Sequence, residues 1–124
     1  NLSRFVMNTR YYPTSTNPYG NAFKNGHPKR FEIWGSNNPN PDGSYDGSWY
    51  LISDYTSVKP SGDTPGATSE EDKELVRNGE IFLIPPGSPS ARYIRFKTNE
   101  PWTPATKYIY MAELTFFGAN VENN

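Results

Sequence analysis

The stretch Arg30-Phe31-Glu32-Ile33-Trp34-Gly35-Ser36 decides the fold, because its apolar and polar side chains alternate. A period of two, with aromatic and β-branched residues, predicts a β-strand with Phe31 and Ile33 on the same face. The following residues, 37–43, are Asn, Pro, Asp and Gly, which supply the positive or fixed φ angles of a chain reversal. Residues 48–55 then open with a second apolar run. We therefore predict an antiparallel hairpin with a long loop at the centre of the core.

Composition bounds the class of protein. A chain of 124 residues fits one domain that can bury a core without metals or crosslinks. Its 12 prolines and 10 glycines are spread along the sequence and indicate many turns, while 15% aromatic residues suit a sheet core. The net charge of -1, without a basic run, argues against nucleic acid as a partner. No segment approaches the roughly 20 apolar residues of a membrane span, so we expect no membrane insertion by this domain.

The remaining segments predict a β-rich fold with one helix. The capping-box pattern Thr68-Ser69-Glu70-Glu71 predicts a helix of about two turns that ends at Asn78-Gly79. Its acidic run is typical of a solvated helix start rather than of a metal or acid/base cluster. Alternating or β-rich sequence predicts further strands at 2–9, 80–84, 91–97 and 108–117. Six strands, one short helix and long loops predict an all-β sandwich or barrel.

Three sequence blocks, taken in order, resemble the discoidin or coagulation-factor type C family of galactose-binding-like domains. The resemblance covers nearly the whole chain and implies an antiparallel jelly-roll β-sandwich. With Lys59-Pro60-Ser61-Gly62, the pattern is most similar to the C-terminal domain of surface lipoproteins of gut Bacteroidetes that are associated with glycan uptake. The blocks are Phe31-Glu32-Ile33-Trp34-Gly35-Ser36 with Asp46-Gly47-Ser48-Trp49, Arg92-Tyr93-Ile94-Arg95-Phe96, and Ala112-Glu113-Leu114-Thr115-Phe116-Phe117-Gly118.

This resemblance also implies a location and a domain context. It implies an extracellular or cell-surface protein, an outer-membrane lipoprotein of a Gram-negative bacterium, with a glycan and neighbouring domains of the same protein as partners. Members of the family normally have further strands before the segment that begins at Leu2. We therefore expect residues 1–124 to be a single domain that lacks its N-terminal strands or is cut from a longer protein.

The order of strands and loops predicts where a ligand binds. If each strand reverses its predecessor, the loops at 10–29, 56–79 and 98–107 gather at one end of the sandwich. The turns at 37–47 and 85–90 then lie at the other end with both termini. Loops on a rigid sheet scaffold commonly carry binding sites, and the resemblance implies the same end. Aromatic rings stack on sugars, and Arg and His donate to hydroxyl groups. The predicted ligand-binding residues are Arg10, Tyr11, Tyr12, Tyr19, His27 and Trp102, with Lys59 converging on the same end.

Several candidates have a purely structural alternative. Trp102 lies between two prolines and is the best candidate for an exposed aromatic, although a tryptophan folded back onto the core fits the sequence equally well. In an extended Tyr11-Tyr12 pair, one ring is buried and the other free. His27, between Gly26 and Pro28, is more typical of a turn. Trp49 is assigned to the core, and Arg95 is expected to pair with Glu113 or Glu32 across the sheet.

Metal and catalytic sites have weaker signals. The resemblance implies a structural calcium whose ligand would be Glu113, with partner ligands from the missing N-terminal segment. The calcium-loop-like residues 38–43 are rejected, because two prolines interrupt them and Trp49 stands where a bidentate Glu is needed. Motifs for a nucleophile elbow, a phosphate loop or a zinc site are absent, so we predict no enzyme. A carboxylate pair formed by folding remains an alternative, with Asp54, Asp63 and Glu100 near the loop end.

Two functions of different class follow from these patterns. The first is a non-catalytic glycan-recognition module that binds at the loop end. The second is a structural or protein-docking module without a small ligand, which predicts packed loop aromatics and a broad, flat apolar patch elsewhere. Hydrolase activity, the third, would require a cleft with two facing carboxylates.

Overall fold

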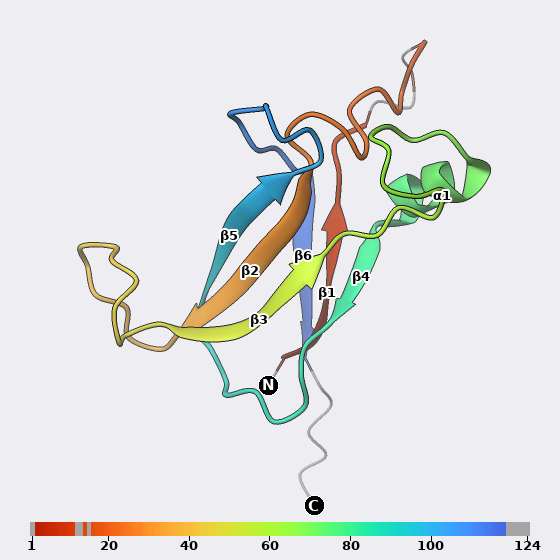
Figure 1. Cartoon of the computed structure of the whole chain (residues 1–124). Coiled ribbons are helices and arrows are strands. Elements are labelled where there is room, and N and C mark those ends of the chain that lie inside the picture. The colour runs from red at the N-terminus through yellow and green to blue at the C-terminus, as the bar shows by residue number, and fades with distance from the viewer. Residues whose placement is uncertain (1, 12–13, 15, 119–124) are drawn as a thin grey trace, which may run out of the picture.

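A computed structural model describes residues 2–11, 14 and 16–118 as two antiparallel sheets that face each other (Figure 1). Sheet A has the strand order β4-β1-β6, and sheet B has the order β3-β2-β5. The predicted all-β sandwich with a single short helix is confirmed. The strands are β1 (Leu2–Asn8), β2 (Pro28–Ser36), β3 (Tyr50–Thr56), β4 (Glu80–Leu83), β5 (Tyr93–Pro101) and β6 (Glu113–Gly118), and the helix is α1 (Glu70–Asn78).

The central hairpin is confirmed with a shifted boundary. Strands β2 and β3 pair antiparallel from Arg30↔Thr56 to Gly35↔Tyr50, and β5 pairs with the other side of β2. Trp49 precedes the strand rather than starting it, because its N–H donates to Asp46 O in the turn (3.1 Å). Its ring is buried, as expected for a core position.

Aromatic rings fill the space between the two sheets. Phe31 on β2 is fully buried and stacks on Phe96 of β5 with 4.6 Å between ring centroids. Phe5 on β1 is fully buried and stacks on Phe82 of β4 at 5.1 Å. Phe5 and Phe31 meet edge to face across the sandwich at 6.2 Å. These contacts explain why the alternating pattern of the sequence predicts the core-facing side of each strand.

The helix begins one residue later than the capping pattern predicts. Ser69, not Thr68, is the N-cap, and its side chain accepts a hydrogen bond from the Asp72 backbone (3.0 Å). Asp72 is fully buried and also accepts from Ser61 N (3.0 Å) and Thr68 N (2.9 Å). This carboxylate therefore fixes the preceding loop to the start of α1.

The last strand is shorter than predicted. Residues 108–110 alternate like a strand, but β6 begins only at Glu113. Tyr110 instead donates its N–H to Gly26 O in the loop between β1 and β2 (3.1 Å). This approach requires a glycine, because a Cβ at Gly26 would collide with the carbonyl oxygen of Tyr108. A loop contact distant in sequence has overridden the local strand pattern.

The long connections gather at one end of the sandwich, as predicted (Figure 1). The β1–β2 and β5–β6 loops and the segment that carries α1 lie together there, while the β2–β3 and β4–β5 turns lie toward the other end. Leu2 pairs with Gly118, so both ends of the described sandwich lie beside each other at that opposite end. No helix among the described residues is long and apolar enough to cross a membrane.

Candidate ligand-binding loop end

The loop end comprises the described parts of residues 9–27, 57–79 and 102–112. Backbone hydrogen bonds tie its three segments together. Gly66 N–H donates to Phe23 O (2.7 Å), and Trp102 N–H donates to His27 O (2.8 Å). These bonds hold the loops together as one scaffold for the side chains on their surface.

Trp102 and His27 lie beneath this scaffold rather than on its surface. Both residues are only 2% exposed. Trp102 packs edge to face on Phe23 at 5.5 Å and donates its Nε1–H to Ser57 Oγ (3.2 Å). His27 Nδ1 accepts a hydrogen bond from Phe23 N (2.7 Å). The folded-back alternative for Trp102 is therefore the arrangement that the structure adopts, and its predicted exposure is wrong.

Glu80, the first residue of β4, is a buried carboxylate for which no local sequence pattern gives a signal. Its two oxygens accept hydrogen bonds from Ser57 Oγ and from Val58 N (3.3 Å). Burial raises the pKa of Glu80 to about 7. Burial likewise lowers the pKa of His27 to about 3. His27 Nε2 is 3.7 Å from Glu80 Oε1, but a neutral imidazole makes this a contact between dipole and carboxyl rather than an ion pair.

Lys59 also has a structural place at the loop end. It is 3% exposed, and its Nζ donates to the carbonyl oxygens of Thr64 and Gly66 (2.7 Å for Gly66). The ammonium group therefore closes its own loop and is not presented to a ligand.

Tyr11 and Tyr19 form the first of two stacked tyrosine pairs. Their rings are nearly parallel, at 4° with 5.8 Å between centroids, and both residues are half-buried. Two cations from α1 border Tyr19. Arg77 Nη1 donates to the hydroxyl of Tyr19 (2.6 Å), and Lys73 Nζ lies 5.8 Å from the centroid of its ring. The loop and the helix together present an aromatic pair with a cationic edge.

Tyr108 and Tyr110 form the second pair, with 6.1 Å between ring centroids. Tyr108 is 59% exposed, whereas the Tyr110 hydroxyl donates to Lys24 O (2.9 Å). Burial raises the pKa of Tyr110 to about 12, against the opposing effect of the charge on Arg10. Arg10 is an exposed residue whose charge acts on Tyr110. Sequence alone does not indicate Tyr108 as a candidate, because the alternation of residues 108–110 predicts a strand.

The other predicted residues have mixed outcomes. Tyr12 lies outside the described residues. Glu113 is exposed and accepts from Thr115 Oγ1 (3.3 Å), and no group of three His, Cys, Asp or Glu that could hold a metal occurs within 2–11, 14 and 16–118. The expected partners of Arg95 are wrong: its guanidinium donates to Gly43 O (2.8 Å) and lies over the rings of Tyr45 and Trp49, each at 4.5 Å. The long turn between β2 and β3 folds back over the sheet and supplies the partners of Arg95 in place of Glu113 or Glu32.

Comparison with known proteins places the chain in a family. Residues 1–118 match the model of DUF5000, described as a domain of unknown function, and the chain belongs to this family. A solved structure named SusE-like protein BT2857 is similar, with a TM-score of 0.77 and 36% sequence identity over 95% of this chain. The match spans 63% of the length of that structure's chain. No curated protein matches. The discoidin assignment stays a prediction, because the matching family model is a different one.

Proposed function

We propose that this chain is a non-catalytic carbohydrate-binding module that holds a glycan on its loop end. The observation that carries the proposal is the pair of tyrosine stacks on loops fixed to a β-sandwich, with Arg77 bonded to the first stack and the charge of Arg10 acting on the second. The sequence resemblance to lipoproteins associated with glycan uptake supports it, as does the similarity to a SusE-like protein. We assign ligand contact to Arg10, Tyr11, Tyr19 and Tyr108.

The chemistry of these side chains suits a hydrated sugar. A tyrosine ring offers an apolar face to the C–H side of a pyranose, and its hydroxyl can bond a neighbouring polar group. The guanidinium of Arg10 donates hydrogen bonds to hydroxyl groups and accepts none. His27 and Trp102 act here as positioning residues, because they support the loops from below.

The same proposal includes a cellular context. We place the module at the cell surface, in an outer-membrane lipoprotein whose other domains share in glycan capture. The solved SusE-like chain extends beyond the matched region, which spans 63% of its length, and this agrees with a module inside a larger protein.

The test is glycan binding by matched tyrosine variants. Titration calorimetry with a panel of soluble polysaccharides should find a ligand for the chain. Tyr108→Ala should then lower its affinity roughly 3- to 10-fold, the equivalent of about 0.5–1.5 kcal/mol for one aromatic contact. Tyr93→Ala is the control, because Tyr93 is 50% exposed but begins β5, away from the loop end. Absence of binding across the panel, or equal losses in both variants, would contradict the proposal.

A further inference from the structure

The outward face of sheet B carries a mixture of aromatic and charged side chains. Phe31 and Ile33 of β2 are fully buried in the core. Side chains alternate along a strand, so the outward residues of β2 are Arg30, Glu32 and Trp34. The sheet B face comprises these three residues together with Tyr45 of the β2–β3 turn and Arg95, Lys97 and Asn99 of β5.

Tyr45 and Trp34 form an aromatic platform at one end of the sheet B face. Their rings meet edge to face with 5.1 Å between centroids, and Tyr45 is 44% exposed while Trp34 is half-buried. The Arg95 guanidinium lies 4.5 Å from the centroid of the Tyr45 ring, and Lys97 Nζ lies 5.5 Å from the same centroid. An exposed ring bordered by hydrogen-bond donors suits the C–H side of a sugar and its neighbouring hydroxyl groups.

Glu32 is held in a fixed position beside this platform. Trp34 Nε1–H donates to Glu32 Oε1 (3.1 Å), and Asn99 Nδ2 donates to Glu32 Oε2 (2.6 Å). Lys97 Nζ lies 4.0 Å from the same Oε2. Each carboxylate oxygen can accept a further hydrogen bond, and a side chain that is already fixed loses little conformational entropy on binding. The sheet B face therefore presents a preorganised acceptor between Trp34 and Asn99.

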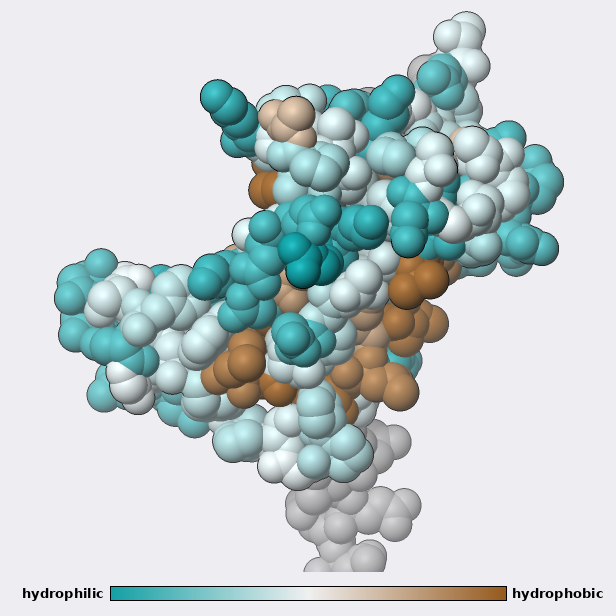
Figure 2. Space-filling view, in the orientation of Figure 1, coloured by the Kyte–Doolittle hydropathy of each residue, from teal (hydrophilic) through white to brown (hydrophobic). Residues whose placement is uncertain are grey.

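A polar hollow lies at the other end of the sheet B face. Its volume is about 220 Å³, and the residues that line it include Arg30, Asp54 and Asn99. Because Asn99 also bonds Glu32, it connects the hollow with the aromatic platform. A strand rises about 3.3 Å per residue, so β2 spans roughly 13 Å from Arg30 to Trp34. Figure 2 shows hydrophilic surface over β2 and β3, which face the viewer in Figure 1.

The charges around this face argue against an acidic ligand. Arg30 is paired with Glu100, with 2.6 Å between Nε and Oε2. The turn that carries Tyr45 adds the exposed acids Asp42 and Asp46. Nearby acids therefore offset the positive groups of the face. An uncharged ligand rich in hydroxyl groups needs both donors and acceptors, and such a mixture of charged groups supplies both.

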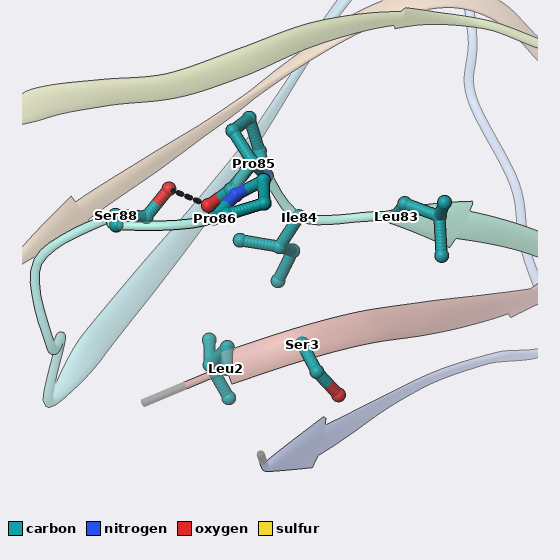
Figure 3. A pocket seen from close by; sticks show the side chains of 8 residues that line it. Leu2, Ser3, Leu83, Ile84, Pro85, Pro86 and Ser88 are labelled. Atoms are coloured by element: carbon teal, nitrogen blue, oxygen red, sulfur yellow. Dashed lines mark hydrogen bonds between the residues drawn. The ribbon is translucent and has the colours of Figure 1, made fainter.

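A larger hollow beside the start of β1 offers different chemistry. Its volume is about 490 Å³, and its lining is mainly apolar, with Leu2, Ile84 and Pro85 among the residues drawn in Figure 3. The hydroxyl of Ser88 in this lining already donates to Pro85 O (2.7 Å). Such a hollow offers few hydrogen bonds to a sugar, so the sheet B face is the surface that suits a ligand rich in hydroxyl groups.

We propose that the sheet B face is a second carbohydrate site, which binds an uncharged oligosaccharide extended along β2. One sugar ring contacts Tyr45 and Trp34. Glu32, Arg95 and Asn99 exchange hydrogen bonds with its hydroxyl groups, and the next sugar unit reaches the polar hollow. This site goes beyond the function proposed for the loop end, because none of its residues belongs to the two tyrosine pairs.

NMR titration of the chain with oligosaccharides tests this site. The probes are linear hexasaccharides of glucose, mannose, galactose and xylose, with hexagalacturonate as the acidic counterpart. At least one neutral probe should shift the indole N–H signal of Trp34 and the side-chain amide signal of Asn99. Tyr45→Ala should lower the affinity measured from the Trp34 signal roughly 3- to 10-fold, because one aromatic contact is lost.

Further variants separate this site from the loop end. Asn99→Ala leaves both rings in place and should lower the affinity by about 3- to 10-fold through lost hydrogen bonds. Leu83→Ala is the control, since Leu83 is 74% exposed on sheet A and should leave the affinity unchanged. Binding at the loop end is followed separately from the backbone amide signals of Tyr19 and Tyr108, so that either site can fail without the other.

Three results would overturn this assignment. The first is an unchanged Trp34 indole signal with every neutral probe. The second is unchanged affinity in Tyr45→Ala or in Asn99→Ala, or an equal loss in the Leu83→Ala control. The third is tighter binding of hexagalacturonate than of the neutral probes at Trp34, which would identify an acidic ligand. Backbone amide spectra of the variants that match the parent outside the sheet B face verify that the sandwich stays folded.

Discussion

The loop end and the β4 edge expose different kinds of apolar side chain, aromatic rings at the first and aliphatic groups at the second. At the loop end Tyr108 and Ile109 are exposed and the other paired tyrosines are half-buried, and the loops beneath them are joined by backbone and side-chain hydrogen bonds. At the β4 edge the exposed surface consists of Ile81, Leu83 and Val58, next to backbone groups that point outward. A tyrosine keeps a polar group for a wet ligand, whereas an aliphatic edge gains most from a dry contact with protein.

The difference shows that one sandwich carries a tyrosine-bearing loop surface and an aliphatic strand edge at separate places. Glu80 stands where the two regions meet: it begins β4, and its carboxyl group accepts hydrogen bonds under the loop end from Ser57 and Val58. A substitution of Glu80 should therefore alter the stability of the loops, whereas a substitution of the exposed residues of β4 should not. The following experiments test that separation.

Trp102→Ala should have the largest effect on the loop end. The indole is 2% exposed and bonds Ser57, so truncation leaves a large cavity at the base of the loops. We expect a loss of about 3–5 kcal/mol in the free energy of unfolding, measured by urea denaturation. Tyr108→Ala, at a residue that is 59% exposed, is the control and should change this free energy by less than about 0.5 kcal/mol. Similar losses in the two variants would break the distinction between supporting and contacting residues.

The pH dependence of stability should reveal the Glu80 carboxyl and His27 as opposing groups. The pKa of His27 falls from 6.5 to about 3 on folding, so its stabilising contribution is present above pH 6.5 and is lost as the pH falls toward 3. The pKa of Glu80 rises from 4.5 to about 7, so its contribution is present below pH 4.5 and is lost as the pH rises through 7. Between pH 4.5 and 6.5 the two slopes cancel.

Glu80→Gln removes one slope and should expose the other. Between pH 4.5 and 6.5 the free energy of unfolding of the variant should rise with pH by up to about 1.4 kcal/mol per unit, while that of the parent stays nearly level. Urea denaturation at half-unit steps of pH measures both curves. A variant as level as the parent would show that His27 is not held neutral by burial.

Local patterns predict the sheets well, because strand alternation and helix capping depend on residues close in sequence. Phe31 and Ile33 are fully buried on β2, and Ser69 lies within the predicted capping segment. The places of Trp102 and Tyr108 depend on partners far away in the chain. Trp102 is buried because it bonds Ser57 and packs on Phe23. Residues 108–110 lie against the β1–β2 loop because Gly26 leaves room for them. The sequence therefore predicts which loops share one end of the sandwich, but it does not predict that the ring of Trp102 is buried and that of Tyr108 exposed.

The burial of Glu80 is likewise not predictable from nearby residues. At the start of an apolar run it resembles any polar residue that begins a strand. Its burial follows from the fold around it: Gly79 ends α1 with a φ of 88°, and the loop after β3 supplies Ser57 and Val58 as donors. No pattern within a few residues of Glu80 encodes those contacts.

Tyr55→Phe should have the smallest effect and bears on the β4 edge alone. The hydroxyl bonds Leu83 O across the open side of the sandwich, while the ring stacks in the core on Phe31 at 5.7 Å. Loss of the hydroxyl should lower the free energy of unfolding of the 1–124 chain by about 0.5–1.5 kcal/mol in urea denaturation. Glycan affinity at the loop end should stay unchanged, because the bond lies along β4 and not under the tyrosine pairs. A fall in glycan affinity with this variant would mean that the two regions are coupled through sheet B.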